Sequence, residues 1–226
     1  MKLSTVARTL KRRLSRPLHR PELRAEYDVL GSHYGGWPLL RSTPQGAVIY
    51  SFGVGTDISF DLTAIERFGC TVVAFDPTPR SLEWLEGLSP PAGFRHLPVG
   101  IGGADMAVEF FAPDKAEHVS FSIRPNDARS RDVVMARVMR LESIMAEFGL
   151  PNPDVIKMDI EGFEYEVIDD FSVGSVRPQQ VLVEFHHGLY GIADGSTITA
   201  VRTLNSIGYR LFYVSPGGHE YGFALL

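Results

Sequence analysis

The sequence predicts an α/β fold of the Rossmann-like kind, with a mostly parallel seven-stranded sheet that ends in an antiparallel hairpin. From residue 47 onward, short apolar runs alternate with helical stretches, which is typical of a parallel sheet covered on both faces. The first apolar run ends in a turn that contains two glycines. The last two strand-like runs are joined only by a short turn around Pro216, and so short a connection can join only antiparallel strands.

The elements follow one another in a regular order. The predicted core strands are residues 47–52, 71–75, 94–99, 155–158, 181–185, 210–214 and 221–226. The predicted helices are residues 59–68, 80–88, 162–171 and 197–207. The segment from residue 104 to 141 does not fit this alternation, and it contains strand-like runs at 106–111, 119–123 and 133–141. These runs are expected to form an insertion ahead of the fourth core strand.

The composition excludes several classes of protein. With 44% hydrophobic and 22% charged residues, the chain can bury a sizeable core, which argues against disorder. Cys70 is the only cysteine, so a disulfide framework and a cysteine-based zinc site are excluded. No apolar run reaches the roughly 18 residues of a membrane span, and no secretory signal is recognised. The expected location is cytoplasmic.

The charge is distributed unevenly along the chain. Residues 1–20 carry seven Lys or Arg and no acid, whereas the remaining residues carry 15 bases against 27 acids. So acidic a body repels phosphates, and no nucleic-acid partner is expected. The basic segment has apolar residues at helical spacing, so it could contact a membrane surface or a partner protein, or it could be a solvated terminus.

The chain divides into two predicted parts. Residues 1–46 form an N-terminal extension, and residues 47–226 form the main domain. Within the extension, aromatic and glycine residues gather between His33 and Pro38. Aromatic side chains beside a glycine pair suit a lid over a ligand, although a packing loop is an equal alternative.

The turn after the first strand predicts a nucleoside site. Gly53 and Gly55 let the backbone pass close to a ligand, and the helix that follows offers free N–H groups. A dinucleotide fingerprint would need a third glycine at position 58, which is Ile58. Asp76 ends the second strand, where a carboxylate can accept hydrogen bonds from both ribose hydroxyls. This pattern favours a nucleoside without a pyrophosphate.

Three segments carry a resemblance to a known family. They are YSFGVGTDISFD at residues 50–61, FDPTP at 75–79 and IKMDIEG at 156–162. Together with matches at 140–144 and 183–186, they resemble the FkbM family of S-adenosylmethionine-dependent methyltransferases. The resemblance covers about residues 47–187. It implies the fold of a Rossmann-like class I methyltransferase and transfer of a methyl group, usually to a hydroxyl of a small molecule or sugar.

The expected cofactor is therefore S-adenosyl-L-methionine. The residues expected to bind it are Gly53, Val54, Gly55, Asp57, Asp76, Pro77 and Gly100. Many class I methyltransferases have an acid just before the first glycine, which meets the methionine ammonium group. Here those positions are Ser51 and Phe52, so Asp57, a backbone carbonyl or another acid must bind that group.

Candidate catalytic residues follow the fourth and fifth core strands. Asp159 ends the fourth strand, and Glu184, His186 and His187 end the fifth. Ligands bind at the carboxyl ends of strands in an open α/β sheet, so these side chains are expected beside the cofactor. A hydroxyl acceptor needs a general base, and His186 is favoured because the ordinary pKa of histidine lies near neutral pH. His187 is the substitute and Asp159 the runner-up.

Metal binding and alternative functions stay open at this point. A metal-free site is favoured, but Asp159, Glu184 and His186 could converge as ligands for Mg²⁺ or a similar ion. Lys157 is unusual in a buried strand and is predicted to pair with Asp76 or Glu184, or to reach a sheet edge. The competing functions are a nicotinamide-dependent oxidoreductase and a non-catalytic cofactor-binding module.

Overall fold

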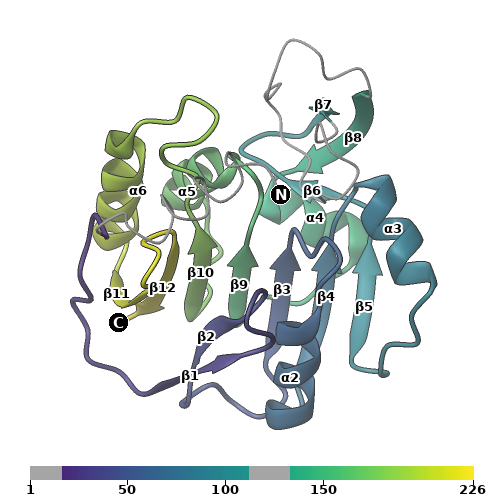
Figure 1. Ribbon diagram of the computed structural model, residues 1–226, viewed down its shortest axis with the longest axis horizontal. Coiled ribbons are helices and arrows are strands. Elements are labelled where there is room, and N and C mark those ends of the chain that lie inside the picture. Colours follow the sequence, from purple (N-terminus) through teal and green to yellow (C-terminus); the bar gives the residue numbers. More distant parts are fainter. Residues whose placement is uncertain (1–16, 112–132) are drawn as a thin grey trace, which may run out of the picture.

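The computed structural model describes residues 17–111 and 133–226. Its main sheet has seven strands in the order β11-β12-β10-β9-β3-β4-β5 (Figure 1). These strands are β3 (Val48–Phe52), β4 (Thr71–Phe75), β5 (Phe94–Leu97), β9 (Val155–Met158), β10 (Gln180–Glu184), β11 (Tyr209–Val214) and β12 (Glu220–Leu225). Pairing is parallel from β10 to β5, and β12 runs antiparallel to both of its neighbours. The predicted fold class and the terminal hairpin are confirmed.

Helices cover both faces of this sheet. They are α2 (Ser59–Phe68), α3 (Pro79–Glu86), α4 (Leu141–Phe148), α5 (Glu164–Val173) and α6 (Asp194–Ser206). Alternation along each strand sends Tyr50 and Phe52 to the face that packs against α4, α5 and α6. Ile49, the residue before Tyr50, faces the opposite side with α2. None of the described helices is long and apolar enough to cross a bilayer.

One predicted strand was too long. The run at 133–141 was expected to continue to Leu141, but β8 (Val133–Met139) ends earlier and Leu141 begins α4. Leu141 and Ile144 are buried, and Phe148 packs partly buried against the same core cluster. This spacing of three and four residues is that of one helix face. It was missed because Leu141 directly follows the apolar run of the strand and was counted as part of it.

The N-terminal hairpin was not predicted. It consists of β1 (Tyr27–Leu30) and β2 (Trp37–Leu40), which pair antiparallel. Trp37, Leu39 and Leu40 are buried in the same core cluster as α2 residues. Residues 27–40 thus share the core of the main sheet, and only the turn between the two strands is left to act as a lid. Residues 1–16, which include most of the basic segment, lie outside the described residues.

A second, three-stranded sheet stands above the carboxyl ends of β3, β4 and β5 (Figure 1). Its order is β6 (Gly100–Ile101), β8 and β7 (Met106–Phe111). The predicted inserted strands at 106–111 and 133–141 are therefore present, the second in shortened form. The predicted strand at 119–123 lies outside the described residues. This insertion supplies one wall of the pocket described next.

Candidate active site

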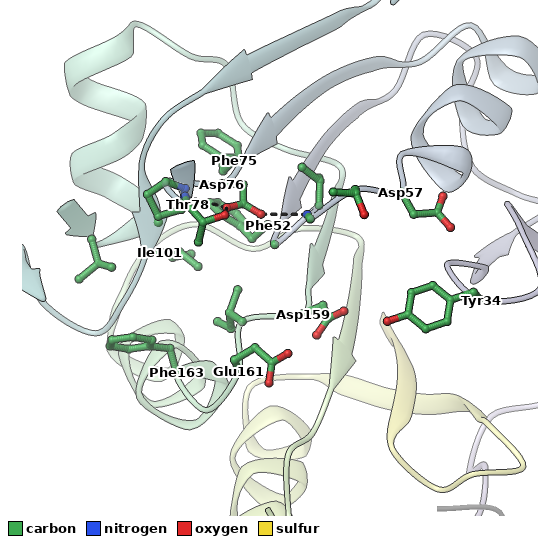
Figure 2. Close-up of a pocket in the computed structure, with 18 residues that line it drawn as sticks. Tyr34, Phe52, Asp57, Phe75, Asp76, Thr78, Ile101, Asp159, Glu161 and Phe163 are labelled. Carbon is green, nitrogen blue, oxygen red and sulfur yellow. Dashed lines mark hydrogen bonds between the residues drawn. The ribbon is translucent and has the colours of Figure 1, made fainter. Parts of the chain in front are cut away.

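A pocket lies at the carboxyl ends of β3, β4 and β9 (Figure 2). All seven residues expected to bind the cofactor line it. Asp159 and Glu161, which follow β9, line the opposite side, and Tyr34 borders it from the N-terminal hairpin. The predicted catalytic residues Glu184 and His186 are not among the lining residues, because they lie behind this wall.

The two glycines of the turn have different roles. Both have positive φ, 72° at Gly53 and 53° at Gly55. A Cβ on Gly53 would lie 1.8 Å from the carbonyl oxygen of Asp159, so this glycine is required by the close approach of the chain after β9. A Cβ on Gly55 would meet nothing within 4 Å. Only Gly55 therefore leaves open space beside the pocket.

Lys157, on the neighbouring strand β9, binds the backbone of the glycine turn. Its ammonium group is buried and donates hydrogen bonds to the carbonyl oxygens of Phe52 at 3.2 Å and Gly53 at 2.8 Å. It also lies 5.2 Å from the ring centroid of Trp37. The prediction that Lys157 pairs with Asp76 or Glu184, or reaches a sheet edge, was wrong, because the turn carbonyls lie closer along the strand register. Both carbonyls are thus already engaged and are poorly placed to bind a cofactor ammonium group.

Asp76 ties the glycine turn to the start of α3. Its Oδ2 accepts a hydrogen bond from the backbone N–H of Gly55 at 2.9 Å. Its Oδ1 accepts two from Thr78, from the backbone N–H at 2.9 Å and from the hydroxyl at 2.6 Å. A carboxylate offers about four acceptor positions, so roughly one remains for a ligand. Accepting both ribose hydroxyls, as predicted, would require the Thr78 hydroxyl to release Oδ1.

Asp57 anchors the turn of the N-terminal hairpin. Its Oδ1 accepts from the backbone N–H of Ser59 at 2.8 Å, and its Oδ2 accepts from the hydroxyl of Ser32 at 2.7 Å. Burial raises the pKa of Asp57, but these hydrogen bonds and the charge of Lys157 hold it below its ordinary value. Tyr34, in the same turn, is 85% exposed and points its hydroxyl toward Asp159 across the pocket (Figure 2).

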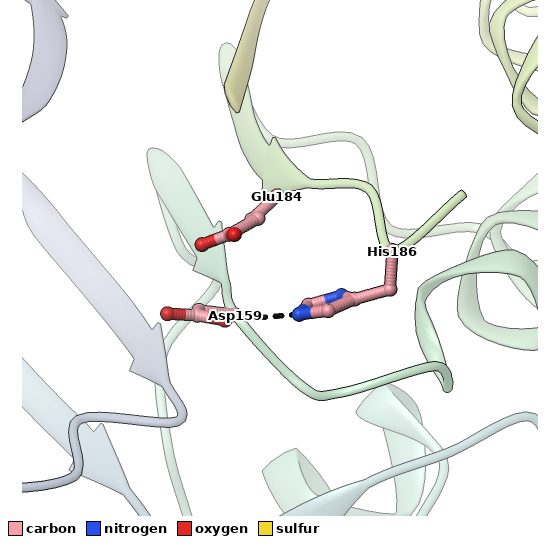
Figure 3. Close-up of side chains that lie close together, drawn as sticks. All are labelled: Asp159, Glu184 and His186. Atoms are coloured by element: carbon pink, nitrogen blue, oxygen red, sulfur yellow. Dashed lines mark ion pairs between the residues drawn. The ribbon is translucent and has the colours of Figure 1, made fainter. Parts of the chain in front are cut away.

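Behind the pocket, acidic side chains surround His186. Glu164 is fully buried, and its Oε1 accepts from the backbone N–H of His186 at 2.8 Å and contacts ring Nδ1 at 3.1 Å. The other ring nitrogen, Nε2, lies 3.3 Å from Glu161 and 3.7 Å from Asp159. Burial alone would lower the pKa of His186, but Glu164, Glu161 and Asp159 raise it to about 9. Figure 3 shows His186 beside Asp159 and Glu184.

Glu161 lines the pocket and is a functional candidate that was not among the predicted catalytic residues. It has a φ of 51°, as does Tyr190, and these are the two non-glycine residues with positive φ in the described parts of the chain. The Tyr190 hydroxyl donates to Glu161 Oε2 at 2.5 Å. The signal in the sequence was the position of Glu161 directly before Gly162, at the end of a strand. Glu164 was missed as well, because an acid in the first turn of a helix is usually explained by the helix dipole.

His187 belongs to the packing between α6 and β12. Its Nδ1 lies 3.1 Å from the hydroxyl of Thr197, and its ring stacks on His219 with centroids 4.5 Å apart. Burial, followed by the charge of His219, lowers the pKa of His187 to about 4. The substitute base therefore points away from the pocket, as alternation along the chain implies.

The chain matches the sequence model of the methyltransferase FkbM domain over residues 47–211. It belongs to the FkbM methyltransferase family. Since the resemblance was carried by the glycine turn, Asp76 and the IKMDIEG segment, the family match and the pocket involve the same residues. The prediction that this is an FkbM-type methyltransferase fold is confirmed.

Curated relatives agree with this family. "Probable methyltransferase-like protein 24" of Rattus norvegicus is 26% identical over 175 residues, and its Homo sapiens counterpart is 27% identical over 175 residues. Each alignment covers 73% of this chain but only 42% of the relative, so the chain spans about two fifths of their length. The crystal structure of methyltransferase FkbM from Methylobacillus flagellatus KT shares the fold, with a TM-score of 0.51 at 16% identity. That match covers 83% of this chain and 45% of the other.

Proposed function

We propose that this FkbM-family methyltransferase uses S-adenosylmethionine and methylates a hydroxyl group of a small molecule or glycan. The observation that carries the proposal is the continuity of one pocket. The glycine turn and Asp76 form one end of it, and the carboxylates of Asp159 and Glu161 form the other. A donor bound at the first end would present its reactive group to an acceptor held at the second.

The residues at the first end fit this cofactor. The space beside Gly55 is open, and Asp76 retains about one acceptor position for a ribose hydroxyl. Pro77 and Gly100 line the neighbouring wall, where the nucleoside base would lie. When bound, the cofactor supplies an electrophilic methyl group on a sulfonium sulfur. The chain contributes contact between donor and acceptor, which alone lowers the barrier of such a displacement.

The acceptor end offers a carboxylate that can take the hydroxyl proton. Glu161 lines the pocket, and its Oε2 is held by Tyr190, while Oε1 has no hydrogen bond from the described residues. As the acceptor oxygen bonds to the methyl carbon, the carbon–sulfur bond breaks and sulfur keeps the electron pair. The hydroxyl proton passes to Glu161. Asp159 is the competing carboxylate, and we assign His186, which does not line the pocket, a positioning role.

A nicotinamide-dependent oxidoreductase is less well supported. Ile58 stands where a dinucleotide fingerprint needs its third glycine, and it is buried against Val54, Ala74 and Leu85. In a dinucleotide-binding fold the third glycine lets the helix pack closely on the strand, whereas here the side chain of Ile58 fills that space. A non-catalytic cofactor-binding module remains the other alternative, and it differs in one respect only, because it binds the cofactor without turnover.

We further propose that the acceptor is not a nucleic acid, because the chain outside residues 1–20 carries 15 bases against 27 acids. A cytoplasmic location, and contact of the basic residues 1–20 with a membrane surface or protein, stay predictions.

Calorimetry with S-adenosylmethionine and with NAD, on the full chain, tests the cofactor. Binding and thermal stabilisation by the first and not the second are expected. Methyl transfer is then measured with isotope-labelled cofactor, using acceptors that differ only in having a hydroxyl or a methoxy group at one position. Stabilisation by NAD alone would overturn the proposal, and cofactor binding without transfer to any acceptor would favour the non-catalytic module.

A further inference from the structure

Three side chains from the ends of β9 and β10 converge behind the pocket (Figure 3). Asp159, Glu184 and His186 each offer one ligand atom, and these atoms lie within 4.8 Å of one another. Glu184 and His186 are 8% and 2% exposed. We propose that these three residues bind one divalent cation, of the kind that accepts both carboxylate oxygen and imidazole nitrogen, such as Mn²⁺.

The orientation of His186 supports this proposal independently of the other two ligands. Fully buried Glu164 contacts Nδ1 at 3.1 Å, so one ring proton is held on that side, and a cation that binds Nε2 would displace the other proton. Nε2 is then directed toward Glu161, 3.3 Å away, and Asp159, 3.7 Å away. A carboxylate behind the far nitrogen is the usual support of a metal-bound imidazole, where it fixes the ring and increases its basicity.

The local charge also favours a cation. Asp159, Glu161 and Glu164 all lie within ion-pair distance of one imidazole, and Glu184 lies beside them. Buried carboxylates are costly unless a positive group compensates them. A divalent ion at the centre of this cluster would contact three of the side chains and offset their charge.

The cluster can hold an ion if its side chains move closer together. With bonds of about 2.1 Å, two ligands on opposite sides of an octahedral ion are about 4.2 Å apart, and two adjacent ligands are about 3.0 Å apart. The ligand atoms lie within 4.8 Å of one another, so an adjacent pair must approach by up to about 1.8 Å. The side chain of Asp159 is 33% exposed, so it can rotate without disturbing the core. Two oxygens and one nitrogen suit an octahedral ion with three positions left open.

The role of such an ion rests on the proposed function. Asp159 also lines the pocket, so the ion would lie at the acceptor end. An acceptor with two neighbouring oxygens, such as a diol or a hydroxy acid, could occupy two open positions. The ion would lower the pKa of the bound hydroxyl, and Glu161 would then take its proton. This narrows the acceptor class to molecules that can chelate a metal.

The test is titration of the chelator-treated full chain with Mn²⁺ alone, followed by electron paramagnetic resonance of free and bound ion. We expect one Mn²⁺ per chain, with nitrogen coupling from an imidazole. Glu184→Gln and Asp159→Asn should each abolish this binding, and Glu164→Gln should weaken it by about 10–100-fold. Glu86→Gln, an exposed acid at the end of α3, is the matched control.

The outcomes separate the metal site from the proposed function. Binding without nitrogen coupling, or binding that persists in both Glu184→Gln and Asp159→Asn, would overturn the site, as would no binding at all. Circular dichroism of each variant excludes unfolding as the cause, and Asp159→Asn, the more exposed substitution, serves if Glu184→Gln does not fold. Methyl transfer that is unaffected by chelator would leave the proposed function intact while removing the ion from it. If the chain binds Mn²⁺ but not S-adenosylmethionine, the metal site stands and the proposed function is overturned.

Discussion

The wall of the pocket formed after β3 and β4 is held mainly through backbone groups, whereas the wall formed after β9 is held by contacts between side chains. In the first wall, Lys157 binds two turn carbonyls and Asp76 accepts from two backbone N–H groups. In the second, the carboxylates of Glu161 and Glu164 each contact the ring of His186. The first wall therefore depends on chain conformation, and the second depends on which side chains are present.

Under the proposed function, this difference separates cofactor binding at the first wall from acceptor chemistry at the second. A wall built on backbone groups keeps its shape whichever acceptor is used, which suits a shared cofactor. A wall built on side chains can change its chemistry by substitution while the strands stay in place. Substitutions in the second wall should therefore affect turnover most, and substitutions in the first should affect stability and cofactor affinity.

Glu161→Gln should have the largest effect. The amide keeps an acceptor for Tyr190 but cannot take a proton, so kcat should fall by about 10²–10⁴-fold. Cofactor affinity, measured by calorimetry, should stay within about twofold, since Asp76 and the turn are unchanged. Glu166→Gln, an exposed acid on α5, is the control and should keep full turnover. If Glu161→Gln is active and Asp159→Asn is not, Asp159 takes the proton.

Lys157→Met tests the first wall. The variant leaves the carbonyls of Phe52 and Gly53 without their buried donor, which should cost about 3 kcal/mol of unfolding free energy. For a chain of this size the melting temperature should fall by about 6–12 °C. The control Arg24→Met removes an exposed cation and should change it little. An unchanged melting temperature would mean that the turn keeps its shape without Lys157.

Asp61 is a buried acid in the first turn of α2, and Asp61→Asn tests whether its carboxyl group titrates in the folded protein. Burial raises the pKa of Asp61 to about 6, although the charge of Lys157 opposes the rise. Between the ordinary pKa and 6 the folded state binds more protons than the unfolded state, so the wild type loses stability as pH rises through 6. Relative to wild type, Asp61→Asn should gain up to about 3 kcal/mol between pH 4 and pH 8 in urea unfolding. A difference that does not vary with pH, or one matched by Asp169→Asn, would contradict this.

Asp76→Ala should have the smallest effect of the four. Removal of the carboxylate loses about one hydrogen bond to the ribose, so affinity for S-adenosylmethionine should fall by about 10–100-fold. Calorimetry measures it, with Glu83→Gln on α3 as the control. Unchanged affinity would show that Asp76 serves only to hold the turn to Thr78.

The sequence was informative where a contact lies within one short segment. The glycine turn, Asp76 and the strand rhythm were predicted because the groups concerned are neighbours along the chain or follow a regular period. The same reasoning misread Lys157, whose partners lie 105 and 104 residues away. That His186 is a base stays a prediction, and the sequence could not show which acids surround its ring.

By itself, the sequence determined the sheet, its terminal hairpin and the glycine turn at one end of the pocket, because hydrophobic period and turn chemistry are local. The tertiary structure decided which acids surround His186, which of them reaches the pocket, and that β1 and β2 complete the core. These depend on side chains brought together from separate segments, and no spacing along the chain records the distance between them in space.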